Sequence, residues 1–268
     1  MGIDIQRAKD LDARLLWHEK YFFIVAPPIL ALSALIISAF VFPETFIPSI
    51  ILGAATFYYS YSCSPKNLCH VRDPYRKEFE SMNEIFRDDI AHPELLVLMD
   101  SEEENACTGS DSNGYYIAVH ASWFEKYPQY ISSIVAHEFA HIERGDAEER
   151  NTGQALIEYW HFGATGLLIP AVTSLGYLFA QAYDIPTRIP LLFLYGVVIF
   201  LVCFLWKSLR LSYAVVRETS CDVKGCLRVG NAKICDFLSI LRDRDGVPTC
   251  RRRILEHRIR FLKTLIEK

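Results

Sequence analysis

Three residues in one short stretch, His137, Glu138 and His141, have the types and spacing needed for hydrolytic chemistry. Residues four apart lie on one face of a helix, so His137 and His141 can aim their imidazoles at one metal ion. Glu138 lies roughly 100° around the helix from His137, beside such an ion without being needed as a ligand. Zinc hydrolases use this arrangement of two nitrogen ligands and a carboxylate base next to the reactive water. The stretch therefore predicts a zinc site.

A catalytic zinc site needs a third protein ligand, which must come from elsewhere in the chain. Glu218 and Asp222 are four residues apart and offer a ligand together with an acceptor for an imidazole N–H. We interpret the carboxylates at 143–149 as the solvated end of the motif's helix. Spacing alone leaves several candidates open: Glu143, Asp146, Glu148, Glu149, Glu158, Glu218 and Asp222.

The zinc motif must lie on a helix, and the surrounding sequence predicts one over residues 129–144. Pro128 precedes it and Gly145 is well placed to end it. Its apolar face consists of Ile131, Ile134, Val135 and Ile142. Apolar segments at 95–99 and 115–119 predict two buried strands. We expect turns around the second strand at Gly109, Ser110, Asp111 and Gly114.

Further helices are predicted outside this central region. Residues 3–20 have an amphipathic pattern, with apolar positions at Ala8, Leu11, Leu15 and Leu16. The mixed-charge segment 76–89 is also expected to be helical. Asn231 can cap a helix that runs to about residue 242, and residues 250–268 predict a final, basic helix. We interpret its cluster at 251–253 as a solvated face rather than a site for anionic headgroups.

The composition points to a membrane protein. Hydrophobic residues make up 51% of the 268 residues, and the mean hydropathy is +0.14. Four runs contain no Asp, Glu, Lys or Arg: 22–42, 45–64, 161–183 and 189–206. Each is close to the roughly 20 residues that a membrane-spanning helix needs. The sequence therefore predicts four transmembrane helices in two hairpins.

Charge and cysteine content predict on which side of the membrane the polar parts of the chain lie. Lys and Arg gather before the first run, after the second and after the fourth, which predicts cytoplasmic termini and a cytoplasmic polar domain. The formal net charge of −4 gives no sign of a nucleic-acid partner. The eight cysteines form no CxxC pair, and we expect mostly reduced thiols.

The order of these features resembles a known family. Two spans, HExxH, two more spans and Arg217-Glu218-x-x-x-Asp222 are typical of the HtpX-type membrane zinc metalloproteases, gluzincins related to the CAAX prenyl proteases. ELLVLMDSEEENACTG, HIERGD and Arg258-Ile259-x-x-Leu262 match further family segments. The chain departs from the family's usual residues at Cys107 and Cys221, among other positions, which indicates a divergent member.

The resemblance implies a role for individual residues. His137, His141 and Glu218 would bind one Zn²⁺ per chain, and Glu138 would be the general base. Asp222 would orient a ligand histidine. The substrate cleft, with an exposed sheet edge to which an extended substrate could add, would be lined by Asn105, Ala106, Tyr115 and Tyr116.

The expected fold is mostly α with a small β-sheet, with four transmembrane helices in two hairpins and a zincin-like α+β catalytic domain. Five segments are predicted. Residues 1–21 form an N-terminal cytoplasmic segment, 22–64 the first hairpin, 65–160 the first catalytic part, 161–206 the second hairpin and 207–268 the second catalytic part.

The expected function is that of a multi-pass, bilayer-embedded zinc endopeptidase with its active site on the cytoplasmic side. By resemblance to the family, its substrates would be unfolded or misassembled membrane proteins, cleaved as quality control. Two alternatives stay open. One is a catalytically silent zinc-binding membrane scaffold, against which the intact Glu138 argues. The other is a CAAX-type prenyl protease, against which the number of predicted spans argues.

Overall fold

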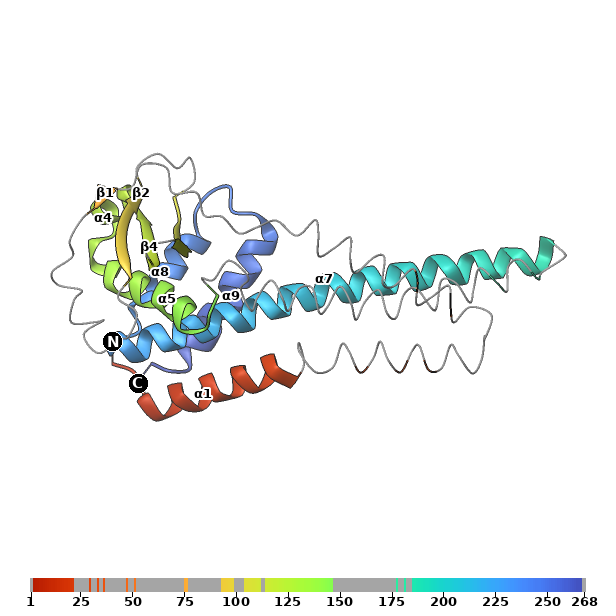
Figure 1. The fold of residues 1–268 in the computed structure, drawn as a ribbon, viewed down its shortest axis with the longest axis horizontal. Coiled ribbons are helices and arrows are strands. Elements are labelled where there is room, and N and C mark those ends of the chain that lie inside the picture. Colours follow the sequence, from red (N-terminus) through yellow and green to blue (C-terminus); the bar gives the residue numbers. More distant parts are fainter. Residues whose placement is uncertain are drawn as a thin grey trace. The chain divides into compact units, whose positions relative to one another are not determined.

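The computed structural model describes residues 2–21, 75–76, 93–98, 104–111, 114–146 and 185–266, and the single residues 29, 33, 36, 47, 51, 177 and 181. The chain divides into two compact units (Figure 1). The first unit comprises residues 1–17, 66–152 and 214–268, and the second comprises residues 18–65 and 153–213. The residues predicted to do chemistry all belong to the first unit.

A four-stranded mixed sheet lies in the first unit, with strand order β1-β2-β4-β3. Its strands are β1 (Tyr75–Arg76), β2 (Glu94–Leu98), β3 (Ala106–Asp111) and β4 (Gly114–His120). β2 and β4 are parallel, while β1 and β3 pair antiparallel with β2 and β4 respectively. The two buried strands predicted from the sequence are confirmed as β2 and β4. Because β4 is paired on both sides, β3 is the outer strand next to it.

The expected turn at Gly109, Ser110 and Asp111 was wrong, since all three residues belong to β3. Their small, polar types are typical of turns, but the register of β3 against β4 overrides that preference. Gly109 pairs with Tyr116, whose phenol oxygen would lie 2.5 Å from a Cβ at Gly109. A side chain there would displace the Tyr116 ring, so the strand uses glycine for packing. Gly114, with φ of +127°, does take a turn conformation.

The helix that carries the zinc motif is α5 (Ile131–Glu143), preceded by α4 (Ala121–Lys126) and one turn of 3₁₀ helix at Pro128–Tyr130. The predicted helix at 129–144 is therefore confirmed, with a tighter first turn. It ends at Glu143, and Gly145 follows with a φ of +74°, which is strained for other residues and suits the predicted helix stop. Nearly every α5 side chain is buried, because both the sheet and other helices cover it.

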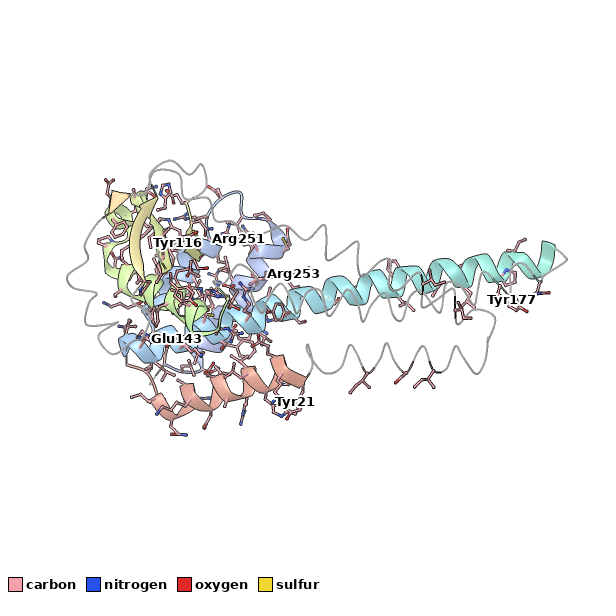
Figure 2. The ribbon with its side chains drawn as sticks, in the orientation of Figure 1. Tyr21, Tyr116, Glu143, Tyr177, Arg251 and Arg253 are labelled. Atoms are coloured by element: carbon pink, nitrogen blue, oxygen red, sulfur yellow. The ribbon has the colours of Figure 1, made fainter. Side chains whose placement is uncertain are left out.

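Three C-terminal helices complete the set: α7 (Ile185–Val229), α8 (Lys233–Arg242) and α9 (Thr249–Lys263). Asn231 Oδ1 accepts a hydrogen bond from the Lys233 N–H at the start of α8, as its predicted capping role requires. The buried face of α9 carries Leu255, Ile259 and Leu262. Arg251 and Arg253, near the start of the helix, are exposed (Figure 2).

The N-terminal helix α1 (Ile5–His18) contributes residues to the core of the first unit. Ala8 and Leu15 are buried as the amphipathic pattern predicts, whereas Leu16 is exposed. Just before the helix, Ile3 bridges to Ile266, and the Asp4 N–H bonds to the Leu265 carbonyl. The two ends of the described chain are thus paired by backbone contacts.

Several predictions concern residues that lie largely outside the described ones. They include the helix at 76–89, apart from Arg76 in β1, and the runs 22–42, 45–64 and 161–183. Within the described residues, no helix combines the length and apolar character that crossing a membrane requires. The four-span prediction is therefore not confirmed. Five of the cysteines form no disulfide, namely Cys107, Cys221, Cys226, Cys235 and Cys250.

Candidate metal centre

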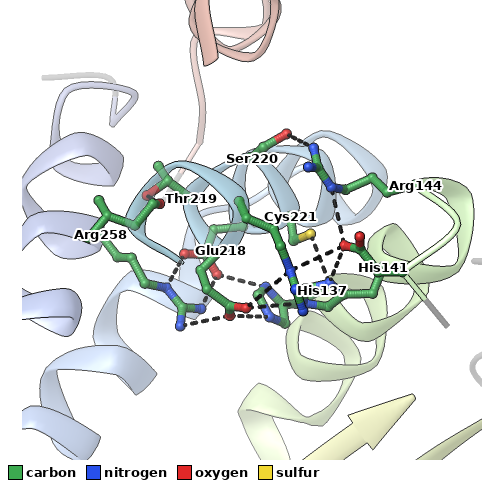
Figure 3. A network of polar contacts seen from close by, with 12 residues as sticks. His137, His141, Arg144, Glu218, Thr219, Ser220, Cys221 and Arg258 are labelled. Carbon is green, nitrogen blue, oxygen red and sulfur yellow. Dashed lines mark hydrogen bonds and ion pairs between the residues drawn. The ribbon is translucent and has the colours of Figure 1, made fainter. Parts of the chain in front are cut away.

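Two helices bring the predicted ligands together: α5 supplies His137 and His141, and α7 supplies Glu218 (Figure 3). The helices can approach closely because α7 has a glycine where it passes the motif. A Cβ at Gly225 would lie 3.1 Å from the His137 backbone nitrogen. Glu218 lies nearly two turns before Gly225, so the carboxylate projects beside both imidazoles.

The geometry of these three side chains fits a zinc ion. Glu218 Oε2 lies 3.5 Å from His137 Nε2, and Glu218 Oε1 lies 3.7 Å from His141 Nε2. Tetrahedral ligands with bonds of 2.0–2.1 Å are about 3.3 Å apart, so small movements would complete the coordination. Two imidazoles and one carboxylate are also a donor set of catalytic zinc sites. The structure thus groups the three residues predicted as ligands.

Asp222 lies against the other ring nitrogen of His137, with its Oδ1 2.8 Å from Nδ1. The same carboxylate accepts two hydrogen bonds of 2.7 Å from Arg258 on α9. Arg258 also donates to Glu218 Oε2 at 3.2 Å. Asp222 is therefore placed to keep the His137 proton on Nδ1 and leave Nε2 for metal. Arg258 holds Asp222 and Glu218 together.

His141 has an equivalent partner in Asp146, whose Oδ2 lies 2.8 Å from Nδ1. Two guanidinium groups reach the same oxygen, Arg144 at 3.3 Å and Arg217 at 3.4 Å. Asp146 is only 7% exposed. Our interpretation of this residue as part of a solvated helix end was therefore wrong. The backbone bends after Gly145 and turns Asp146 back onto the helix, where its N–H bonds to the His141 carbonyl.

Burial and neighbouring charges set the ionisation of the site. Burial lowers the pKa of His137, but the charge and hydrogen bond of Asp222, with that of Glu218, outweigh burial and raise it to about 10. Burial raises the pKa of Glu218, but the charges of His141 and Arg258 and a hydrogen bond from His137 hold it well below its usual value. Glu218 is thus ionised, as a zinc ligand must be.

Glu138 is more deeply buried than Glu218, whose side chain is 26% exposed. Burial raises the pKa of Glu138 above its usual value, against the opposing charges of His137 and His141. A raised pKa brings the carboxylate closer to exchanging protons at neutral pH, which suits a general base.

The four residues predicted to line a substrate cleft take different positions. Ala106 begins the outer strand β3, and the carbonyl of the exposed Asn105 accepts a hydrogen bond from the His120 N–H. Tyr115 and Tyr116 lie on β4, inside the sheet; Tyr115 packs against the main core and Tyr116 covers Gly109. An extended chain could not pair with β4, so an added strand would have to pair with β3.

Comparison with known families agrees with this geometry. The sequence model of peptidase family M48 matches residues 80–231, more than half of the chain. The chain belongs to peptidase family M48. Searches among curated proteins and among solved structures gave no match. Members of the M48 family are zinc-dependent metallopeptidases, and the matched region contains His137, Glu138, His141 and Glu218.

Several residues of this M48 site have roles that the sequence did not reveal. Sequence reasoning includes Arg258 only in a segment that resembles the family, and it assigns Asp146 to a solvated helix end. A usable signal existed for Asp146. It lies five residues after His141 and directly follows Gly145, the glycine predicted to end the helix. No local signal existed for Arg144 or Ser220, because their contacts depend on how α5 meets α7.

Proposed function

We propose that this M48 peptidase is an HtpX-type zinc endopeptidase, embedded in a membrane, that cleaves unfolded or misassembled membrane proteins. The observation that carries the proposal is the convergence of both histidine Nε2 atoms on Glu218, beside the buried Glu138. The family match supports metallopeptidase chemistry, and the family resemblance supports the choice of substrate.

The chain's own residues supply the acid–base chemistry. Zinc held by His137, His141 and Glu218 would polarise the scissile carbonyl and make a water molecule more acidic. Glu138 takes a proton from the attacking water and delivers it to the departing amine. Asp222 and Asp146 keep the two imidazoles oriented with Nδ1 protonated. Arg258 keeps the ligand carboxylate and its neighbour ionised in a buried site.

We expect an extended substrate to bind by adding a strand to the sheet. Among the described strands, β3 is the outer one beside α5, and its outer edge is where an extended peptide would add. This mode requires an unfolded segment, since a folded substrate has its backbone groups already paired. Strand addition recognises the backbone of the substrate rather than its side chains, which suits a broad range of unfolded substrates.

The membrane setting is supported by the side chains of the predicted spans. The described residues of these runs expose large apolar groups to an unusual degree, Phe193 being 75% exposed. The others are Ile29, Ile36, Ile47, Ile51, Ile189, Leu194, Phe200, Leu201 and Phe204. Soluble surfaces rarely gather so much exposed apolar area, and hydrocarbon chains would cover it. The Lys and Arg distribution favours a cytoplasmic active site.

The decisive experiment replaces Glu138 by Gln. The variant keeps the ligands and is expected to bind one zinc per chain while losing about 10²- to 10⁴-fold in peptide hydrolysis. Glu143→Gln is the matched control, because Glu143 lies on the same helix with an exposed side chain. Wild-type cleavage rates in a zinc-loaded Glu138→Gln variant would contradict the proposal.

Two outcomes separate the alternatives. If the zinc-loaded wild type degrades neither casein nor a misassembled membrane protein, the chain is a zinc-binding scaffold. If it cleaves only a prenylated peptide, it acts as a CAAX-type protease. Cleavage of both unfolded substrates without dependence on prenylation agrees with the proposal.

A further inference from the structure

A polar contact connects the N-terminal helix with the metal centre. Ser220 on α7 donates its hydroxyl hydrogen to Asp12 Oδ1 of α1 at 2.6 Å. The same hydroxyl oxygen accepts a hydrogen bond from Arg144 Nη1 at 3.0 Å (Figure 3). A serine two residues after a metal ligand thus joins a carboxylate and a guanidinium that are far apart in the sequence.

The contacts continue from Arg144 to a ligand histidine. Arg144 Nε lies 3.3 Å from Asp146 Oδ2, and that oxygen lies 2.8 Å from His141 Nδ1. An unbroken series of hydrogen bonds therefore runs from Asp12 through Ser220, Arg144 and Asp146 to His141. Each partner is within hydrogen-bonding distance of the next.

The Ser220 hydroxyl has little freedom to change its hydrogen-bond partners. Ser220 is completely buried, so its hydroxyl has no access to water. It has one hydrogen, which Asp12 accepts, and its lone pairs face Arg144. Removing the Asp12 carboxylate would free the hydroxyl to rotate and weaken its hold on Arg144. Arg144 would then be a less fixed partner for Asp146.

Apolar contacts hold α1 in place independently of Asp12. Ala8 and Leu15 are buried in the core of the first unit, and Ile3 bridges to Ile266. The polar contact is thus not needed to attach the helix. A neighbouring carboxylate on α1, Asp10, accepts a hydrogen bond from Gln6 of the same helix and lies on the exposed surface. The two aspartates can therefore be compared directly.

We propose that Asp12 is a positioning residue for the metal centre, acting through Ser220 and Arg144 to hold Asp146 against His141. The inference rests on the proposed function, because it concerns the zinc site. It makes the N-terminal helix a functional part of the peptidase. Partners of a ligand histidine typically change metal affinity by about 10- to 100-fold. We expect a smaller effect for Asp12, about 3- to 10-fold, because it acts from further away.

The test measures zinc affinity of the full chain by competition with a chelator, together with kcat, KM and Tm. Asp12→Asn should weaken zinc binding about 3- to 10-fold and lower kcat at saturating substrate with little change in KM. Asp10→Asn should match the wild type. Asp12→Glu, which keeps the carboxylate, should recover most of the lost affinity.

Two further variants separate positioning from folding. Leu15→Ala removes apolar contacts of α1 and should lower Tm while leaving zinc affinity unchanged. Ser220→Ala should weaken zinc binding, and adding Asp12→Asn to it should cause no further loss, because both changes break the same series.

Wild-type zinc affinity in Asp12→Asn, or additive losses in the double variant, would overturn the inference alone. The inference also fails if Leu15→Ala weakens zinc binding as much as Asp12→Asn does at equal loss of Tm. A wild-type chain that binds no zinc, or binds it without His137, His141 and Glu218, would overturn the proposed function as well.

Discussion

In the candidate metal centre, each of the two histidines contacts an aspartate, and each aspartate contacts at least one arginine. Asp222 with Arg258 supports His137, while Asp146 with Arg144 and Arg217 supports His141. Burial raises the pKa of both aspartates, but other contacts outweigh it. The pKa of Asp222 is lowered chiefly by the Arg258 charge, and that of Asp146 by the His141 hydrogen bond and the Arg217 charge. Both aspartates therefore act as acceptors. The imidazoles are thereby held in the tautomer that leaves Nε2 for the metal.

At the residue scale, replacing Arg258 should be costly. Arg258→Gln leaves the buried Asp222 carboxylate without its guanidinium partner, which should destabilise the metal-free protein by about 3–5 kcal/mol. Bound zinc would offset part of this loss, since it compensates the charge of Glu218. Denaturant unfolding with and without zinc measures the difference. Arg260→Gln, on the exposed face of α9, is the control and should change stability by less than about 0.5 kcal/mol. An equal effect in both variants would refute the role of Arg258.

Glu104 forms a second charged centre, immediately before the outer strand β3. Its Oε1 accepts hydrogen bonds from Ser122 and Lys126. Its Oε2 accepts one from Trp123 and lies 2.8 Å from Arg244 Nη1. The Lys126 hydrogen bond, assisted by Ser122 and the Arg244 charge, outweighs burial and lowers the pKa of Glu104 to about 2. Glu104 thereby ties the start of β3 to α4 and to the segment after α8.

The lowered pKa predicts a pH-dependent stability. Because the pKa of Glu104 is lower in the folded than in the unfolded chain, its contribution is complete above the unfolded value, about pH 4.5. It is lost as the pH falls from there towards about 2. Glu104→Gln should therefore destabilise by about 1 kcal/mol near neutral pH and by less at about pH 3.5. Urea unfolding at both pH values tests this, with the exposed Glu125→Gln as control. A pH-independent difference would contradict the prediction.

At the element scale, the site depends on how closely α7 passes α5. The nearest atoms to a Cβ at Gly225 are backbone atoms of Ala136 and His137, which cannot rotate aside. The distance between ligands on the two helices is therefore fixed by a glycine that binds nothing itself.

Gly225→Ala should force the two helices apart by a few tenths of an ångström. Zinc affinity should fall about 10-fold, as expected when ligands lose their orientation. Gly196→Ala is a matched control on the same helix, because a Cβ there meets nothing within 4 Å. That change should leave zinc affinity unaltered. It should stabilise the helix by about 0.5–1 kcal/mol, because alanine has a higher helix propensity than glycine. Unchanged zinc affinity in Gly225→Ala would show that the crossing tolerates a methyl group.

At the scale of the whole molecule, zinc should stabilise the fold because its ligands come from two helices far apart in the sequence. With zinc at about 100 times its Kd, the gain is about 2.7 kcal/mol. Thermal unfolding before and after chelation measures this gain. Glu218→Ala should abolish both zinc binding and the shift in Tm, and full metal occupancy in that variant would exclude Glu218 as the third ligand.

The sequence predicted the parts of this molecule that depend on local spacing. The histidine pair lies at helical spacing, Gly145 ends the helix, and the strand at 115–119 has a clear apolar pattern. Local spacing made Glu218 one of several candidate ligands, and the family resemblance selected it, because its distance from the motif follows from the tertiary fold. Arg258 and Asp12 depend on how α9 and α1 pack against α7, so no local pattern reveals them. β3 was missed because its small polar residues are typical of turns and form a strand only by pairing with β4.

The contact between Arg258 and the two α7 carboxylates also bears on when the peptidase becomes active during synthesis. The histidines and Glu138 leave the ribosome first, Glu218 follows, and Arg258 comes last, on α9. Until α9 is made, Glu218 and Asp222 lack the guanidinium group that bridges them. A ribosome-bound chain can therefore contain every ligand and still lack an assembled site. Such a delay would keep the peptidase inactive until its synthesis is nearly complete.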